Sequence, residues 1–91
     1  MKDSRYNIVG KLIRSNELKM FSEIVDVIPK TRLAIDLGIN PERFNRLLAN
    51  KELFVLKDLY TLADLLEVDL MPLVQLLHNQ IQADKKTRRK R

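Results

Sequence analysis

The fold of this chain of 91 residues is decided by residues 30–51, which read KTRLAIDLGINPERFNRLLANK. Apolar residues recur at helical spacing in the first part of this stretch, at Leu33, Ala34 and Leu37. Gly38 follows where a helix commonly ends in a left-handed residue, a conformation that glycine adopts without steric penalty. These signals predict a short helix over Thr31–Leu37 that is closed by Gly38.

The next residues carry three signals for the start of another helix. Asn40 suits the N-cap, Pro41 suits the first helical position, and Glu42 places an acid near the positive end of the helix dipole. We therefore expect a helix over Pro41–Ala49, with Asn50 as a left-handed residue at its end. On the buried side of this helix we place Phe44, Leu47 and Leu48.

A link of only three residues, Gly38–Asn40, holds the two expected helices at a steep angle to each other. The small side chain of Ala34 allows a close crossing. Apolar residues fill the space between the helices: Leu33, Leu37, Ile39, Phe44 and Leu47. This is helix-turn-helix geometry over about residues 30–51, in which the second helix presents its N-terminal residues to the major groove of DNA.

Apolar residues at helical spacing predict further helices outside this unit. One covers about residues 4–14, and the next ends before Pro29, which disfavours helical geometry in the residue ahead of it. The others cover about residues 56–67 and the residues after Asp69, which suits an N-cap. We therefore expect an all-α fold, a compact bundle of five to six helices, in a single domain over residues 1–83.

Positive charge is concentrated in two parts of the chain, although the net charge of +5 is modest. Residues 30–51 hold five basic and two acidic side chains, and residues 85–91 hold six basic side chains and no acid. Residues 52–84 hold one basic and six acidic side chains. Residues 84–91 have too little apolar surface to fold, so we expect a flexible basic tail there. The pattern suits contact with a polyanion, and it equally suits a solubilising tail with ordinary solvated faces.

The composition also excludes several classes of function. Without cysteine there is no disulfide and no thiolate metal site, and the one histidine, His78, is expected to be a surface or interface residue of the last helix. No nucleophile, base and acid can be grouped, and the two glycines cannot form a phosphate-binding loop. We therefore expect no enzyme, no metal and no cofactor. Because no apolar run approaches about 20 residues, we expect a cytoplasmic protein without a membrane partner.

Residues 30–51 and the helices after them resemble the lambda repressor and Cro type of bacterial helix-turn-helix domain. Within the unit, the matching residues are Leu33, Ala34, Leu37, Gly38, Ile39, Phe44, Leu47, Asn50 and Lys51. Beyond it, the likeness continues in the spacing of Leu56, Leu59, Leu62, Ala63, Leu66, Val68 and Leu70. The resemblance covers about residues 17–77 and implies a sequence-specific transcriptional regulator that binds double-stranded DNA.

The resemblance also implies which side chains contact DNA. The positions that meet bases correspond to Pro41, Glu42, Arg43 and Arg46. The positions near phosphates correspond to Lys30, Asn40 and Lys51. Asn45 lies on the same helix, within reach of a base or a phosphate. The side chains suit these contacts, since arginine can bond guanine O6 and N7 together and glutamate can accept from cytosine N4. Pro41 departs from the family, because it removes a side chain that usually reaches bases.

We expect the DNA-binding protein to be a homodimer, and two hypotheses of other kinds remain open. The leucine-rich last helix has apolar residues on more than one face, which suggests a homodimer seam. The residues of that seam are Leu70, Leu73, Val74 and Leu77. The same excess suits a non-catalytic module that binds a protein partner through its C-terminal helices. RNA association through the basic tail is the second hypothesis, and the lack of aromatic stacking motifs weakens it. Binding that depends on Arg43 and Arg46, rather than on the tail alone, distinguishes the DNA hypothesis.

Overall fold

The computed structural model describes residues 4–89, with side chains as far as Lys86, and every regular element in this range is helical. The first three helices are α1 (Ser4–Arg14), α2 (Ser22–Val27) and α3 (Lys30–Leu37). They are followed by α4 (Pro41–Ala49), the short 3-10 helix η1 (Lys51–Leu53), α5 (Leu56–Leu66) and α6 (Leu70–Arg89). The all-α class predicted from the sequence is confirmed.

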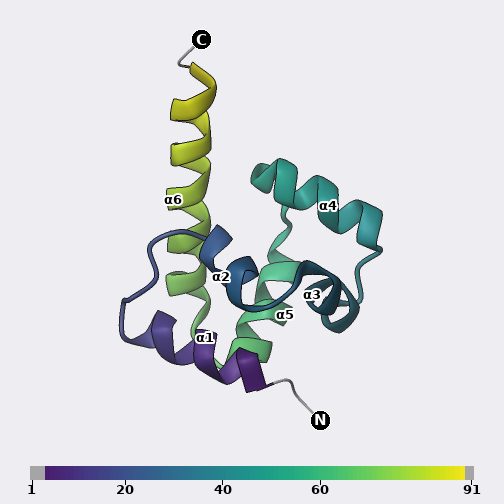
Figure 1. Ribbon diagram of the computed structural model, residues 1–91, viewed down its shortest axis with the longest axis vertical. Helices are drawn as coiled ribbons and strands as arrows, with labels where there is room; N and C mark the ends of the chain where they lie inside the picture. The colour runs from purple at the N-terminus through teal and green to yellow at the C-terminus, as the bar shows by residue number, and fades with distance from the viewer. Residues whose placement is uncertain (1–3, 90–91) are drawn as a thin grey trace.

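Helix α5 lies at the centre of the bundle and contacts α1, α3 and α6 (Figure 1). In that view α6 stands upright along one side, α1 crosses below, and α3 and α4 lie on the other side. The largest fully buried side chains are Tyr6, Phe21, Phe44, Ile24, Ile28, Leu33, Leu62, Leu66, Leu73 and Val9. They come from every α-helix and form one core. None of the helices in the described range is both long and apolar enough to cross a membrane.

Three helices end at a residue with positive φ. These residues are Asn16 after α1 (φ 60°), Gly38 after α3 (φ 71°) and Glu67 after α5 (φ 57°). In each case the following residue donates its N–H to a carbonyl five residues earlier, at 2.9–3.0 Å, which satisfies the last turn of the helix. The prediction for Gly38 is confirmed. The prediction for Asn50 is wrong, because its φ of −136° is extended and the chain passes directly into η1.

Helix α2 is shorter than the apolar stripe that begins at Leu18 suggests. The backbone N–H groups of Lys19 and Met20 donate to Glu23 Oε1 at 2.7 and 2.8 Å, so these residues form a capped turn ahead of the helix. The bonds from Met20 and from Lys19 hold the pKa of the Glu23 carboxyl below its usual value. Leu18 still packs against the core from this turn, which explains why its spacing looks helical.

Helix α6 is longer than expected. The predicted flexible tail over residues 84–91 is wrong for residues 84–89, which continue the helix to Arg89. Two interactions explain the extension: Asp84 and Lys85 form ion pairs with residues of η1, and basic side chains near the end of a helix are favoured by its dipole. Residues 90–91 of the predicted tail lie outside the described range.

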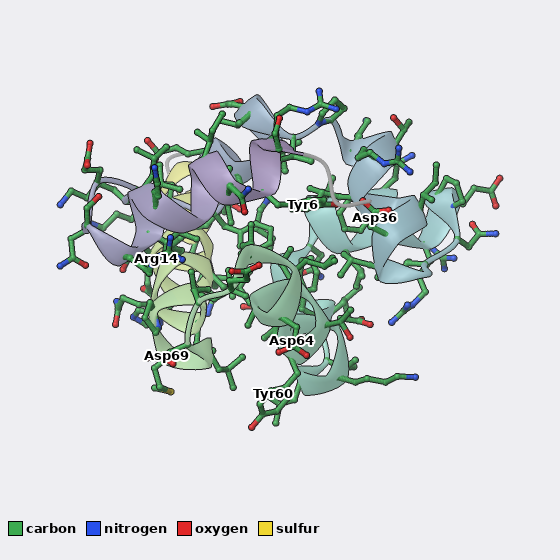
Figure 2. All side chains as sticks on the ribbon, turned by 90° about the horizontal axis from the view of Figure 1, so that it is seen from below. Tyr6, Arg14, Asp36, Tyr60, Asp64 and Asp69 are labelled. Carbon is green, nitrogen blue, oxygen red and sulfur yellow. The ribbon has the colours of Figure 1, made fainter. Side chains whose placement is uncertain are left out.

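A hydrogen bond ties α1 to α3. The Tyr6 hydroxyl donates to Asp36 Oδ2 at 2.6 Å, and Figure 2 shows these two side chains next to each other. Arg32, one turn earlier on α3, lies 3.4 Å from the same carboxylate oxygen. Because Tyr6 is buried and Asp36 is half-buried, this contact holds α3 in a defined position relative to the rest of the bundle.

The two glycines of the chain provide a matched test of the packing. A Cβ on Gly10 would lie 2.3 Å from the carbonyl oxygen of Leu66, whereas a Cβ on Gly38 would meet nothing within 4 Å. We predict that Gly10→Ala lowers the free energy of unfolding by about 1–3 kcal/mol, because α1 must move away from α5. We predict a loss of about 1 kcal/mol for Gly38→Ala, from backbone strain at positive φ alone.

Urea unfolding followed by circular dichroism measures both effects. A Gly10→Ala protein as stable as the wild type would contradict the close approach of α1 to α5, since alanine is otherwise favoured over glycine within a helix.

Candidate nucleic-acid interface

The turn between α3 and α4 is fixed by three consecutive residues. Gly38 takes the left-handed conformation and donates its N–H to the carbonyl of Ile35 at 3.1 Å. Ile39 is buried, with 6% of its surface exposed, and so anchors the turn in the core. Asn40 Oδ1 accepts hydrogen bonds from the backbone N–H groups of Glu42 (2.8 Å) and Arg43 (3.4 Å). Together these contacts set the point at which α4 begins and the direction in which it runs.

Helix α4 has one buried face and one exposed polar face. Phe44 and Leu47 are buried, and the aromatic ring of Phe44 meets that of Phe54 edge to face, with 6.5 Å between ring centroids. Six residues of the helix are exposed: Pro41, Glu42, Arg43, Asn45, Arg46 and Ala49. Four of them, Glu42, Asn45, Arg46 and Ala49, follow one another at spacings of three and four and so share one face. Arg46 makes no ion pair with any residue in the described range.

Lys30 and Asn45 lie at the same place in the structure, although 15 residues separate them. Both line a shallow notch of about 50 Å³ where the start of α3 meets the first turns of α4. Thr31 and Pro41 complete its exposed rim, while the buried residues Ala34 and Phe44 form its floor. The notch is too small for a cofactor, but it shows that Lys30 lies next to the first turns of α4.

Arg43 lies at the edge of α4 and forms an ion pair that the sequence did not reveal. Its Nη2 donates to Asp58 Oδ2 at 3.0 Å, and only 10% of the Asp58 side chain is exposed. The pair holds the first turn of α4 against the first turn of α5. The Arg43 side chain itself is 44% exposed, so its contact with a base stays a prediction, although its guanidinium is already engaged with Asp58.

Lys51 does not lie where a phosphate contact requires. Only 10% of its side chain is exposed, its Nζ donates to the carbonyl of Leu48 at 2.6 Å, and Asp84 Oδ2 lies 3.5 Å away. The ammonium therefore satisfies the end of α4, where helix carbonyls carry partial negative charge, and links it to α6. The prediction of Lys51 as a phosphate contact is corrected to a structural role.

Asn40 is also a structural residue in this structure, because its side-chain oxygen caps α4. No sequence signal identified the partners of Arg43 and Lys51, since Asp58 and Asp84 are 15 and 33 residues away from them along the chain. The predicted DNA-contacting residues that remain exposed without an ion pair in the described range are Lys30, Pro41, Glu42, Asn45 and Arg46.

The expected homodimer seam is largely inside the molecule. Leu73 is fully buried and Leu77 has 7% of its surface exposed, while Leu70 and Val74 are half-buried against the core. The prediction of these residues as a dimer interface is therefore wrong for Leu73 and Leu77. The apolar excess on this helix is explained by its contacts with α1, α5 and η1, which cover more than one of its faces.

Comparisons of the chain with protein family models, with curated protein sequences and with solved structures find no match. Within the described residues, no group of three or more histidine, aspartate and glutamate side chains is placed to hold a metal ion.

The cap of α4 gives a direct test of this geometry. We predict that Asn40→Ala lowers the free energy of unfolding by about 1 kcal/mol, because two backbone N–H groups lose their acceptor. Asn45→Ala, on the exposed face of the same helix, is the matched control and should leave stability unchanged or slightly higher. Asn40→Asp should keep the stability of the wild type, since aspartate caps equally well. Equal stability of the two alanine variants in urea unfolding would contradict the capping role.

Proposed function

We propose that this chain is a sequence-specific DNA-binding protein, a transcriptional regulator that inserts α4 into the major groove of double-stranded DNA. The observation that carries the proposal is the α3–α4 pair: two helices joined by a fixed three-residue turn, with the second presenting an exposed polar face. Such an arrangement is the one by which helix-turn-helix proteins place a recognition helix. An α-helix with its side chains is about 10–12 Å in diameter, which matches the width of the major groove, about 12 Å.

The side chains of the exposed face suit base recognition. Arg46 can donate to O6 and N7 of one guanine, Asn45 can bond N6 and N7 of an adenine, and Glu42 can accept from cytosine N4. All three lie on the same side of α4, within about one turn of one another. Lys30, at the nearby notch, is placed to contact a phosphate beside the groove, a contact that positions the protein without reading sequence.

The electrostatics of the α3–α4 region favour recognition by specific contacts over general attraction. Five basic residues lie in 30–51, but Arg32, Arg43 and Lys51 are each paired with an aspartate. Lys30 and Arg46 remain as the cations without a pair among the described residues. Two such charges give little non-specific affinity, because that affinity grows with the number of phosphates neutralised.

A second candidate function rests on an exposed apolar group between η1 and the first turns of α5. Its members are Leu53, Val55, Leu56 and Tyr60, each with 48–62% of its surface exposed. Figure 2 shows Tyr60 pointing away from the body of the molecule. Such a group is typical of a protein-contact surface. The hypothesis of a protein-interaction module assigned the partner-binding surface to the leucine-rich face of α6, which is buried. The exposed apolar group is the surface that this hypothesis now requires.

Arg46 provides the test that separates these functions. After selection of bound duplexes from a random pool at about 150 mM salt, where non-specific attraction is weak, we predict an enriched sequence. On that sequence Arg46→Ala should cost about 1–3 kcal/mol of binding free energy and relax the preference at one base pair. Arg46→Lys should recover only part of the loss, since an ammonium cannot match the two-point contact.

The matched control is Lys11→Ala, which removes one positive charge from an exposed position on α1, away from α4 (Figure 1). It should leave the preference unchanged. Circular dichroism confirms that each variant is folded. A pool without enrichment, or equal binding by folded Arg46→Ala and wild-type protein, would contradict the proposal and favour the protein-contact function.

A further inference from the structure

The C-terminal turns of α6 project beyond the rest of the molecule. The last apolar residue of this helix that packs against the core is Ile81, and the helix continues to Arg89. In Figure 1 these final turns rise above every other element, on the side of the bundle toward which α4 also lies. Apolar burial therefore does not account for the position of this end of the helix.

Two ion pairs join this part of α6 to η1. Lys51 Nζ lies 3.5 Å from Asp84 Oδ2, and Lys85 Nζ lies 3.2 Å from Glu52 Oε2. The charges alternate, since each element contributes one acid and one base to the two pairs. The Lys85–Glu52 pair is half-exposed and weak by itself, but the Lys51 side chain is shielded and also bonded to the end of α4. Because η1 directly follows α4, the pairs couple the direction of α6 to that of α4.

Beyond these pairs the helix is strongly basic. Residues 86–89, which we call the basic arm, contain one lysine and two arginines and no acid. Lys86 is exposed and makes no ion pair with any residue in the described range. The arm rises about 6 Å along the helix axis, a length over which one DNA strand presents about two phosphates. The α3–α4 region supplies few free cations, whereas three of the four residues of the arm are basic.

We propose that the basic arm is a rigid second contact with DNA, which binds phosphates of the duplex whose groove receives α4. The ion pairs between α6 and η1 set its direction, so that α4 and the arm engage the same duplex at once. This inference rests on the proposed function for the identity of the polyanion. It differs from a flexible polycationic tail, because it requires the arm to keep its orientation relative to α4.

Two insertions of equal length and charge test the orientation. Ala-Ala inserted between Lys85 and Lys86 keeps the helix but rotates the residues beyond it by about 200°. Gly-Gly at the same place weakens the helical connection and lets the arm reorient. Both insertions lie beyond the core and leave the Lys85–Glu52 pair in place, and circular dichroism checks the fold. The readouts are the affinity for the selected duplex and the slope of log affinity against log salt.

If the arm is rigid and makes two phosphate contacts, Ala-Ala should reduce the slope by about 2 and the affinity at about 150 mM salt by about tenfold. Gly-Gly should cause a smaller loss, because the freed arm can return to the phosphates. Insertions that both bind like the wild type would overturn the proposal. Retained sensitivity to Arg46→Ala in that case would leave the proposed function intact, whereas a wild-type protein that binds no duplex would overturn both.

Discussion

The reversal of the chain between α3 and α4 is the constraint on which the candidate site depends. Three residues, Gly38–Asn40, end one helix, reverse the chain and begin the next helix, and each has a different structural role. Gly38 adopts a backbone conformation that is strained for other residues, Ile39 fixes the turn by burial, and Asn40 replaces the missing acceptors at the start of α4. Once these are in place, Phe44 and Leu47 can only face the core, and the polar side of α4 faces outward.

The charge distribution along the sequence does not match the charge distribution on the surface of the fold. Along the sequence, residues 30–51 form a basic segment, which suggests a basic surface. In the fold, Asp36, Asp58 and Asp84 each pair with one of its basic side chains, so most of this charge holds helices together. What remains is a small set of free groups on α4 and α3, together with the end of α6. This division suits a protein in which specific contacts, more than net charge, determine where it binds.

Local signals allowed much of this structure to be predicted. The boundaries of α1 and α4, the left-handed Gly38 and the cap at Asn40 follow from residues within one or two turns of each other, and all are confirmed. The apolar stripe before Pro29 begins ahead of α2, because Leu18 packs against the core from the preceding turn. The cap at Asn40 is confirmed, and its contact with a phosphate stays a prediction.

The features that the sequence could not predict depend on contacts between distant residues. Nothing near Arg43 or Lys51 in the sequence shows that an aspartate on another helix will pair with each. The leucines of α6 were taken for a dimer surface because periodicity shows how many apolar residues a helix carries, but not how many neighbours cover it. The length of α6 could not be predicted either, because the extension of this helix depends partly on ion pairs with η1, and only the fold brings these residues together.

The central claim, that α4 is the surface that meets DNA, can be tested most directly by a titration of isotope-labelled protein with the selected duplex at about 150 mM salt, followed by nuclear magnetic resonance. The account predicts that the largest changes in backbone amide shifts fall on the first turns of α4, on Lys30 and on the end of α6. Shift changes confined to the apolar group at Leu53–Tyr60, or to α1, would contradict it.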